Sequence, residues 1–119
     1  LPGKPDHWYA DCVAESYFGE LIKHGVKVYR YTPGFLHGKS IMVDREAAFV
    51  GSANMDYRSF IFHFECGAWI CDNSTVLDIK DQFSEILKVS EEIKIDKWKK
   101  RPLKMRFKQA LLHIFAPFM

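Results

Sequence analysis

The sequence predicts an α/β fold in which a mixed sheet is flanked by helices. Two stretches carry apolar side chains at helical spacing, and short apolar runs between them alternate as strands do. Turn residues, above all Pro33-Gly34 and Gly51, separate these runs. Helices are expected at residues 7–24 and 75–89, and strands at residues 26–31, 36–44, 47–50 and 64–70. This order is typical of an α/β domain, and 119 residues are enough for one core.

The first helix is expected to begin after Asp6, which suits an N-cap, and to end at Gly25. Its apolar stripe should face the core and consists of Trp8 or Tyr9, Val13, Tyr17 and Leu21. The second helix follows the capping run Asp72-Asn73-Ser74. Its inward residues are expected to be Val76, Ile79, Phe83, Ile86 and Leu87.

Residues suited to chemistry gather around the second predicted strand. Side chains repeat with period two along a strand, so His37 and Lys39 should project from the same face of residues 36–44. Phosphoryl transfer needs this pairing, because a nucleophile or acid must be positioned in line and a cation must neutralise the non-bridging oxygens. The turn that follows the next strand adds Ser52 and Asn54, whose side chains can hydrogen bond to phosphate.

Two acidic residues complete the candidate catalytic set. Glu65 lies at the start of the strand 64–70, and a carboxylate that reaches His37 would hold the imidazole in one tautomer and stabilise its cation. Asp44 ends the strand 36–44, where aspartate commonly caps a turn, so its role is expected to be a supporting one. Each residue alone is more often structural, but the full string H-x-K-x(4)-D-x(6)-G-S-x-N is rare by chance and favours a catalytic site.

The run HGKSIMVDREAAFVGSAN, from His37 to Asn54, resembles the signature of the phospholipase D superfamily. The opening LPGKPDH and the segments GELIKHGVKVYRYTPGFLHGKS, GSANMDYRSF and KKRPLKMRFKQALLHIFAPFM are similar to the C-terminal part of bacterial cardiolipin synthases. The resemblance therefore covers nearly the whole chain, and it implies a phospholipase D-like fold and a transferase of phospholipid biosynthesis.

The resemblance also implies a mechanism. Family members bring two motif copies together, and one histidine attacks phosphorus to give a phosphohistidine while the other protonates the leaving alcohol. In a cardiolipin synthase one phosphatidylglycerol donates its phosphatidyl group, glycerol leaves, and a second phosphatidylglycerol accepts the group, with no metal or other cofactor. His37 would belong to the second copy as general acid/base, oriented by Glu65. The residues expected to bind phosphate oxygens are Lys39, Asn54 and, in support, Ser52.

The chain carries one motif copy, since no other histidine is followed two residues later by lysine. With leucine at position 1, it is expected to be a C-terminal fragment, an incomplete half of a two-lobed enzyme that is inactive alone. Residues 1–92 would form the catalytic half-domain and residues 93–119 a basic tail. The missing N-terminal half, with the first motif, is therefore an expected partner.

Cysteines and hydropathy give two further expectations. Cys12, Cys66 and Cys71 are odd in number, which fits a reducing compartment. The spacing of His63 to the last two matches no common zinc pattern, so free thiols are favoured over a metal site. No apolar run approaches the roughly 18 residues of a spanning helix. The resemblance places membrane-spanning segments upstream and locates the protein at the bacterial cell membrane.

The last part of the chain differs in charge. Residues 93–119 hold eight Lys or Arg and one acid, a net charge of +7, whereas residues 1–92 carry −5. Pro102 can open a helix, after which apolar residues recur at helical spacing: Leu103, Phe107, Leu111, Ile114 and Phe115. A basic amphipathic helix edged by Trp98 is typical of an interfacial segment. An anionic membrane surface is favoured as its partner over packing on the core or a nucleic-acid patch.

Two alternatives stay open. Arg58, in the segment MDYRSFIF, could bind a lipid head group, although bracing of the loop through Asp56 is favoured. The leading function is transfer of a phosphatidyl group between two phosphatidylglycerols, with no nucleic acid as partner. A single-motif nuclease that completes its site as a homodimer, or an inactive fragment that binds membranes, are the competing functions.

Overall fold

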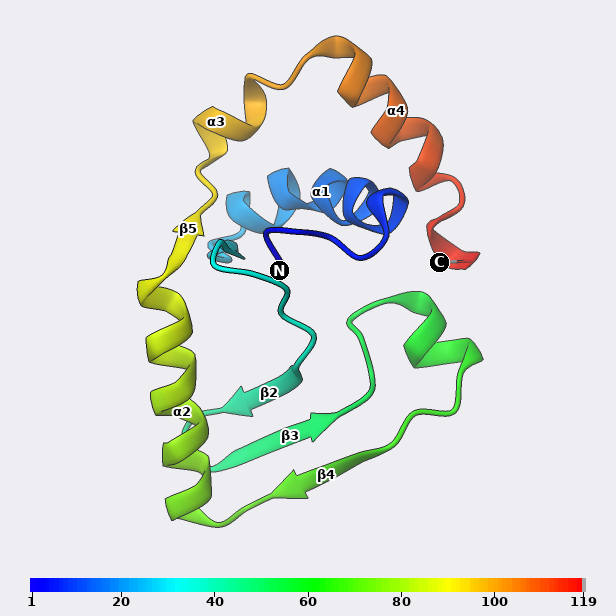
Figure 1. Ribbon diagram of the computed structural model, residues 1–119. Helices are drawn as coiled ribbons and strands as arrows, with labels where there is room; N and C mark the ends of the chain where they lie inside the picture. Colours follow the sequence, from blue (N-terminus) through cyan, green and yellow to red (C-terminus); the bar gives the residue numbers. More distant parts are fainter. Residues whose placement is uncertain (119) are drawn as a thin grey trace. The chain divides into compact units, whose positions relative to one another are not determined.

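The computed structural model describes residues 1–118 and divides into two compact units. Unit 1 comprises Leu1–Leu36 and Ser90–Met119, and unit 2 comprises His37–Val89. Figure 1 traces both units along the chain. The sequence motif from His37 to Glu65 thus lies wholly within unit 2.

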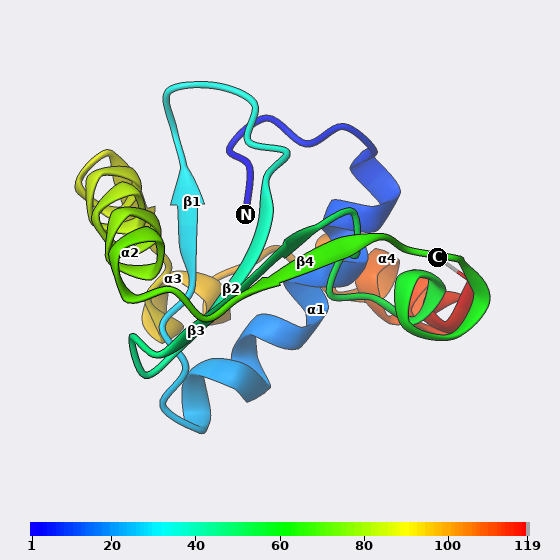
Figure 2. The same ribbon diagram turned by 90° about the horizontal axis from the view of Figure 1, so that it is seen from below.

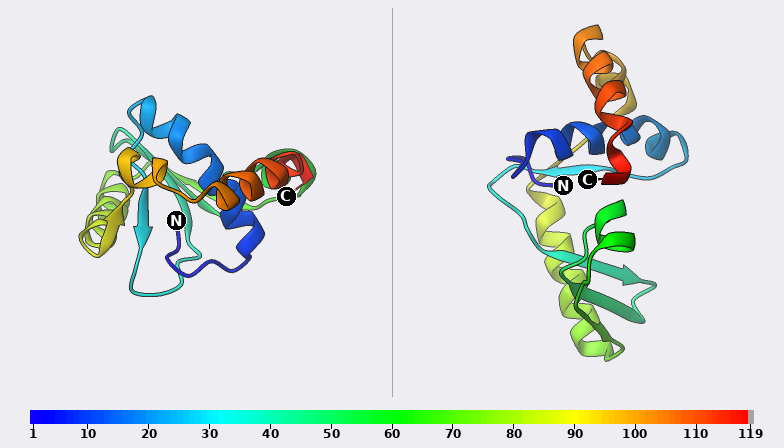
Figure 3. Two further views of the ribbon diagram at one scale, coloured as in Figure 1. Left: turned by 90° about the horizontal axis from the view of Figure 1, so that it is seen from above. Right: turned by 90° about the vertical axis from the view of Figure 1, so that its right-hand side faces the viewer.

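Unit 1 is built on helix α1 (Trp8–Lys23). Strands β1 (Tyr29–Tyr31) and β5 (Ser90–Glu92) form a short antiparallel sheet, and Tyr31 pairs with Ser90. Helix α3 (Ile95–Lys99), helix α4 (Leu103–His113) and a 3-10 turn η2 (Ala116–Phe118) complete the unit. Helices α3 and α4 both pack against α1 (Figure 3). Residues 93–118 are therefore part of a packed unit.

The side of α1 that is buried differs from the predicted stripe. Val13 is buried as expected, but Trp8, Tyr9 and Leu21 are exposed, and the buried set is Cys12, Val13, Phe18 and Gly19. The indole of Trp98 lies so close to Gly19 that a Cβ there would come 2.2 Å from the ring. Helix α3 packs on this face of α1. The core of unit 1 is therefore formed by this face and not by the predicted stripe.

The ends of α1 confirm half of the prediction. Gly25 has φ 85°, a conformation that favours glycine just after a helix end. The N-cap position is His7 and not Asp6, and no side chain caps it. The expected cap was therefore wrong by one residue.

A polar cluster around Glu15 joins α1 to three other elements. Its carboxylate accepts from Arg30 Nη2 at 2.6 Å and from Gln109 Nε2 at 3.0 Å. Its backbone oxygen accepts from Trp98 Nε1 at 2.9 Å. Arg30 also bridges to Asp11 at 3.0 Å. Partly buried charges are stable here because each has an opposite charge or a hydrogen-bond partner.

Unit 2 contains strands β2 (Lys39–Val43), β3 (Ala47–Gly51) and β4 (Gly67–Ile70) in that spatial order. Both pairings are antiparallel, and Figures 1 and 2 show the three strands side by side. The α/β class is confirmed, but within residues 1–118 the expected mixed sheet is replaced by two separate antiparallel sheets. A short turn between β2 and β3 permits only antiparallel pairing.

Helix α2 (Asn73–Lys88) contacts β3 and closes the core of unit 2. Asp72 caps it by accepting the backbone N–H of Thr75 at 3.0 Å, as predicted. Val76 of α2 and Ala48 of β3 are fully buried. Leu87, which was expected to face inward, is exposed.

Candidate active site

The His–Lys pair lies at the start of β2. His37 precedes the strand by two residues, so the predicted strand was too long at this end. The ammonium of Lys39 nevertheless lies 2.9 Å from each ring nitrogen of His37 and 2.9 Å from its carbonyl oxygen. The expected proximity of imidazole and cation is present. Because His37 lies outside β2, the contact is made by the long lysine side chain and not by two neighbours on one strand face.

Asp44 lies at the other end of β2, in the turn to β3. Asp44 and Arg45 have φ values of 48° and 64°, and Glu46 N–H donates to Val43 O at 3.0 Å. Two central residues with positive φ define a type I′ hairpin turn. At about 3.3 Å per residue, the strand separates Asp44 from Lys39 by roughly 16 Å. The structure therefore places Asp44 in a hairpin turn and does not bring it to the His–Lys pair.

Ser52 and Glu65 form the second part of the candidate site. Ser52 Oγ donates to Glu65 Oε2 at 2.5 Å and accepts the backbone N–H of Cys66 at 3.0 Å. The backbone N–H of Ser52 also donates to Cys66 O at 2.8 Å. These bonds continue the β3–β4 ladder beyond Gly51 and Gly67, so the serine side chain fixes the carboxylate at the end of the sheet.

Ser59, which the sequence did not single out, extends this network. It is buried in the π-helical turn η1 (Arg58–Phe62), and its Oγ accepts the backbone N–H of Asn54 at 3.1 Å. Asp56 holds the turn by accepting the backbone N–H of Ser59 at 2.7 Å. An aspartate three residues before a serine was the only sequence signal for this turn.

The pKa of Glu65 lies below the usual value for glutamate. Hydrogen bonds from the Ser52 and Ser59 hydroxyls are the main causes, and the charges of His63 and Lys39 act in the same direction. Glu65 is therefore a carboxylate at neutral pH, as the orientation of an imidazolium would require. The predicted contact of Glu65 with His37 stays a prediction.

Arg58 is engaged within its own segment. Its Nε donates to His63 Nε2 at 2.8 Å, while Asp56 binds the backbone of Ser59. The favoured bracing role agrees with this contact, but the partner is His63 and not Asp56.

Gly51 and Gly67, paired at the end of the β3–β4 ladder, have no room for a side chain. A Cβ on Gly67 would come 2.2 Å from the Phe49 ring, and one on Gly51 would meet Cys66 O at 2.6 Å. The Phe49 ring also contacts Trp69, with centroids 5.4 Å apart. Glycine is thus required at both positions, and the chain lies close beside Ser52 and Glu65 as a result.

Two absences among residues 1–118 bear on the site. No group of three His, Cys, Asp or Glu side chains is placed to hold a metal ion, and the cysteines are free thiols. None of the helices in the same range is long and apolar enough to cross a membrane.

Unit 2 thus holds a histidine beside a lysine and an ionised glutamate bound by serine, which are residue types that sites for phosphate esters commonly use. Residues 1–87 match the family described as cardiolipin synthase, PLD-like domain. The chain belongs to this family.

Curated relatives agree with that assignment. The cardiolipin synthase of Clostridium perfringens strain SM101 is 38% identical over 119 residues, which are 100% of this chain and 25% of the relative. The cardiolipin synthase of Listeria monocytogenes serotype 4a is also 38% identical, with the same coverage. The chain thus spans about a quarter of the length of the curated relatives it matches. No solved structure matches it.

Proposed function

We propose that this chain supplies the second H-x-K-x(4)-D motif of a phosphatidyltransferase that makes cardiolipin from two phosphatidylglycerols and releases glycerol. The observation that carries the proposal is the Lys39 ammonium 2.9 Å from the His37 ring nitrogens. Similarity to cardiolipin synthases along the whole chain supports the choice of substrate. The site of action is the bacterial cell membrane, where these lipids reside.

The reaction needs two histidines, and the other one belongs to a first motif copy outside this chain. That histidine attacks the phosphorus of one phosphatidylglycerol, so that a P–N bond forms and the P–O bond to glycerol breaks. His37, as imidazolium, gives its proton to the departing glycerol oxygen. Neutral His37 then takes the proton from the hydroxyl of the second phosphatidylglycerol, whose oxygen attacks phosphorus as the P–N bond breaks.

The other residues of unit 2 serve charge and orientation. Lys39 neutralises the non-bridging phosphate oxygens as negative charge builds up on them, and Asn54 donates hydrogen bonds to the same group. The Ser52 hydroxyl donates to Glu65 and supports the site through that carboxylate. Glu65 stabilises the imidazolium of His37, a role that its lowered pKa supports. Asp44 supports the site indirectly, through the hairpin turn that ends β2.

A chimaera tests the proposal. This chain replaces the 119 matched residues of the Clostridium perfringens relative, and cardiolipin and glycerol are measured with phosphatidylglycerol vesicles. The chimaera should form both products in equal amounts. His37→Asn should lower the rate by about a hundredfold to ten-thousandfold, the usual range for general acid/base catalysis. The matched control is His24→Asn in unit 1, which should keep full activity.

The alternative function has its own readout. The unfused chain is assayed against DNA and bis(p-nitrophenyl) phosphate, and its oligomeric state is measured. Hydrolysis of either substrate by a homodimer, without lipid product from the chimaera, would assign the chain to the nucleases instead.

A further inference from the structure

One face of α4 packs against α1. Gln109 is only 2% exposed and donates to Glu15 at 3.0 Å. One turn later, His113 Nδ1 lies 3.0 Å from Ser16 Oγ, and its ring contacts Tyr17 with centroids 4.6 Å apart. Positions 109 and 113 therefore mark the side of α4 that faces α1.

The opposite face of α4 is apolar and exposed. Four side chains have more than half of their surface in solvent: Leu103 (78%), Phe107 (73%), Leu111 (51%) and Ile114 (68%). At 3.6 residues per turn these positions fall within an arc of about 80°, centred about 160° from Gln109. A stripe of this kind is what an amphipathic helix normally buries, yet unit 1 is already packed on the other side.

Exposed cations flank the stripe. Lys104 and Lys108 lie along one edge and Arg106 along the other, and Lys99 and Lys100 precede the helix. Lys108 Nζ lies 4.0 Å from the centre of the exposed Trp8 ring, which adds an aromatic side chain at that edge. Residues 93–119, which include α4, carry a net charge of +7.

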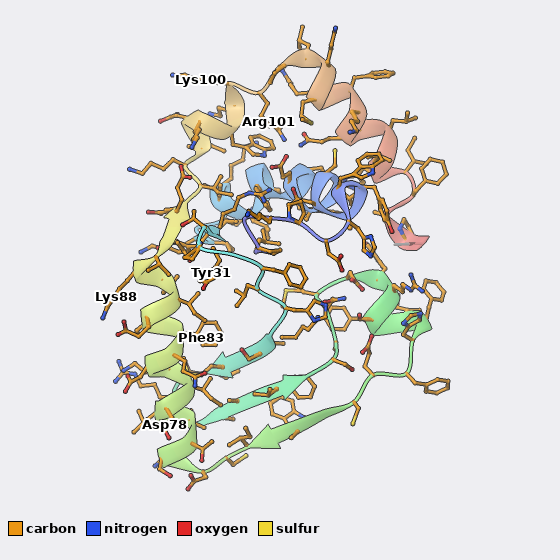
Figure 4. All side chains as sticks on the ribbon, in the orientation of Figure 1. Tyr31, Asp78, Phe83, Lys88, Lys100 and Arg101 are labelled. Carbon is orange, nitrogen blue, oxygen red and sulfur yellow. The ribbon has the colours of Figure 1, made fainter. Side chains whose placement is uncertain are left out.

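Trp98, which was expected at the edge of this surface, and Arg101 are half-buried and turn toward α1. Trp98 donates to Glu15 O, and the Arg101 guanidinium stacks on the Trp98 ring at 3.4 Å. Figure 4 shows Arg101 pointing toward α1 and Lys100 pointing away from it. The exposed surface is thus confined to α4 and the lysines just before it.

We propose that this face of α4 lies in the surface of an anionic lipid bilayer, with the four apolar side chains inserted among the acyl chains and the cations on lipid phosphates. The charge is complementary to anionic lipid, and the apolar width matches an interfacial helix. A duplex nucleic acid fits less well, because it would satisfy the cations but leave the apolar stripe in water. The α4 surface belongs to unit 1, whereas the candidate active-site residues belong to unit 2.

Flotation of the 119-residue chain with vesicles tests the proposal without any turnover, so its outcome is independent of the proposed function. Vesicles of equal parts phosphatidylglycerol and phosphatidylcholine should bind the chain, and vesicles of phosphatidylcholine alone should bind it weakly. Leu111→Asp and Phe107→Asp should each lower partitioning roughly tenfold or more. The matched control is Leu77→Asp on α2, a leucine of similar exposure (45%), which should change it little.

Charge is tested in the same assay. The double variant with Lys104→Glu and Lys108→Glu should bind anionic vesicles roughly tenfold less and lose most of its salt dependence. Circular dichroism checks that each variant is folded, which is expected because the altered side chains are exposed. Equal binding by folded Leu111→Asp and Leu77→Asp, or equal binding to both vesicle types, would overturn the proposal. Preferential binding to duplex DNA would also overturn the proposal. So would self-association that Leu111→Asp abolishes, in a chain that does not bind vesicles.

Discussion

Ser52 Oγ donates to the Glu65 carboxylate at 2.5 Å, and this bond joins the end of β3 to the segment that leads into β4. The same hydroxyl accepts the backbone N–H of Cys66, so it is held from both sides. Because this bond favours the ionised carboxylate, it is the main cause of the lowered pKa of Glu65. Ser52 is thus a positioning residue, because its single hydroxyl proton is on the bond to Glu65 and would have to leave it to reach a phosphate.

Ser52→Ala should raise the pKa of Glu65 toward the ordinary value of about 4.3. Removal of the hydroxyl leaves the carboxylate one strong donor short, so protonation becomes easier. Carbon-13 NMR titration of the side-chain carboxyl in the purified chain measures this directly. The control is Ser84→Ala on α2, where the hydroxyl donates to Lys80 O. This variant should leave the titration of Glu65 unchanged. An unchanged pKa in Ser52→Ala would show that the bond is not formed in solution.

Asp72 predicts a pH dependence of stability. Its pKa is lowered by hydrogen bonds from Ser74 and Thr75 at the start of α2. A lowered folded-state pKa stabilises the protein above the unfolded-state pKa, about 3.9, and this contribution is lost as the pH falls through the folded-state pKa. Asp72→Asn should therefore unfold at lower urea than wild type at pH 7, and the difference should shrink in acid. A difference that stays constant down to pH 2 would contradict this assignment.

Gly19 predicts a stability effect in unit 1. A Cβ at this position would come within 2.2 to 2.8 Å of the Trp98 ring, so Gly19→Ala must displace the indole that α3 packs on α1. We expect a loss of about 1–3 kcal/mol in the free energy of unfolding, measured by urea denaturation. Gly34→Ala has open space around its Cβ and serves as the control within the same unit. Equal stability of the two variants would mean that Trp98 does not pack there.

Arg45 predicts a gain in stability. Its φ of 64° is a left-handed conformation that costs a non-glycine residue about 1 kcal/mol, and a type I′ turn favours glycine at this position. Arg45→Gly should therefore raise the free energy of unfolding by up to about 1 kcal/mol, because the strain in the folded state is relieved. Glu46→Gly, next to it but without positive φ, should instead be neutral or destabilising. A loss of stability in Arg45→Gly would argue against the type I′ turn.

The sequence predicted features that local rules determine. The Asp72 cap, the start of α4 after Pro102 and the left-handed Gly25 all depend on neighbours within a few residues. The buried face of α1 could not be predicted, because Trp98, about 80 residues away, decides which side is covered. The same holds for the exposed apolar side of α4, where Gln109 turns inward to reach Glu15.

The candidate site also contains residues that the sequence predicted and residues that it did not. Spacing alone identified His37, Lys39, Ser52 and Glu65 as a group, and the structure places the His–Lys pair and the Ser–Glu pair in one unit. Ser59 was missed because its role depends on a π-helical turn that returns the chain to Asn54. Asp44 shares the motif by spacing, but an extended strand carries it away from Lys39.

The most direct measurement of the central claim uses His37→Asn in the chimaera described above, with bis(p-nitrophenyl) phosphate as substrate. Because the leaving group is p-nitrophenolate, a stable anion that needs no proton from the enzyme, a variant that lacks only the general acid should still form the phosphohistidine once. We predict a burst of about one p-nitrophenol per chain together with loss of cardiolipin formation. Loss of the burst as well, in a folded variant, would contradict the account and make His37 the nucleophile.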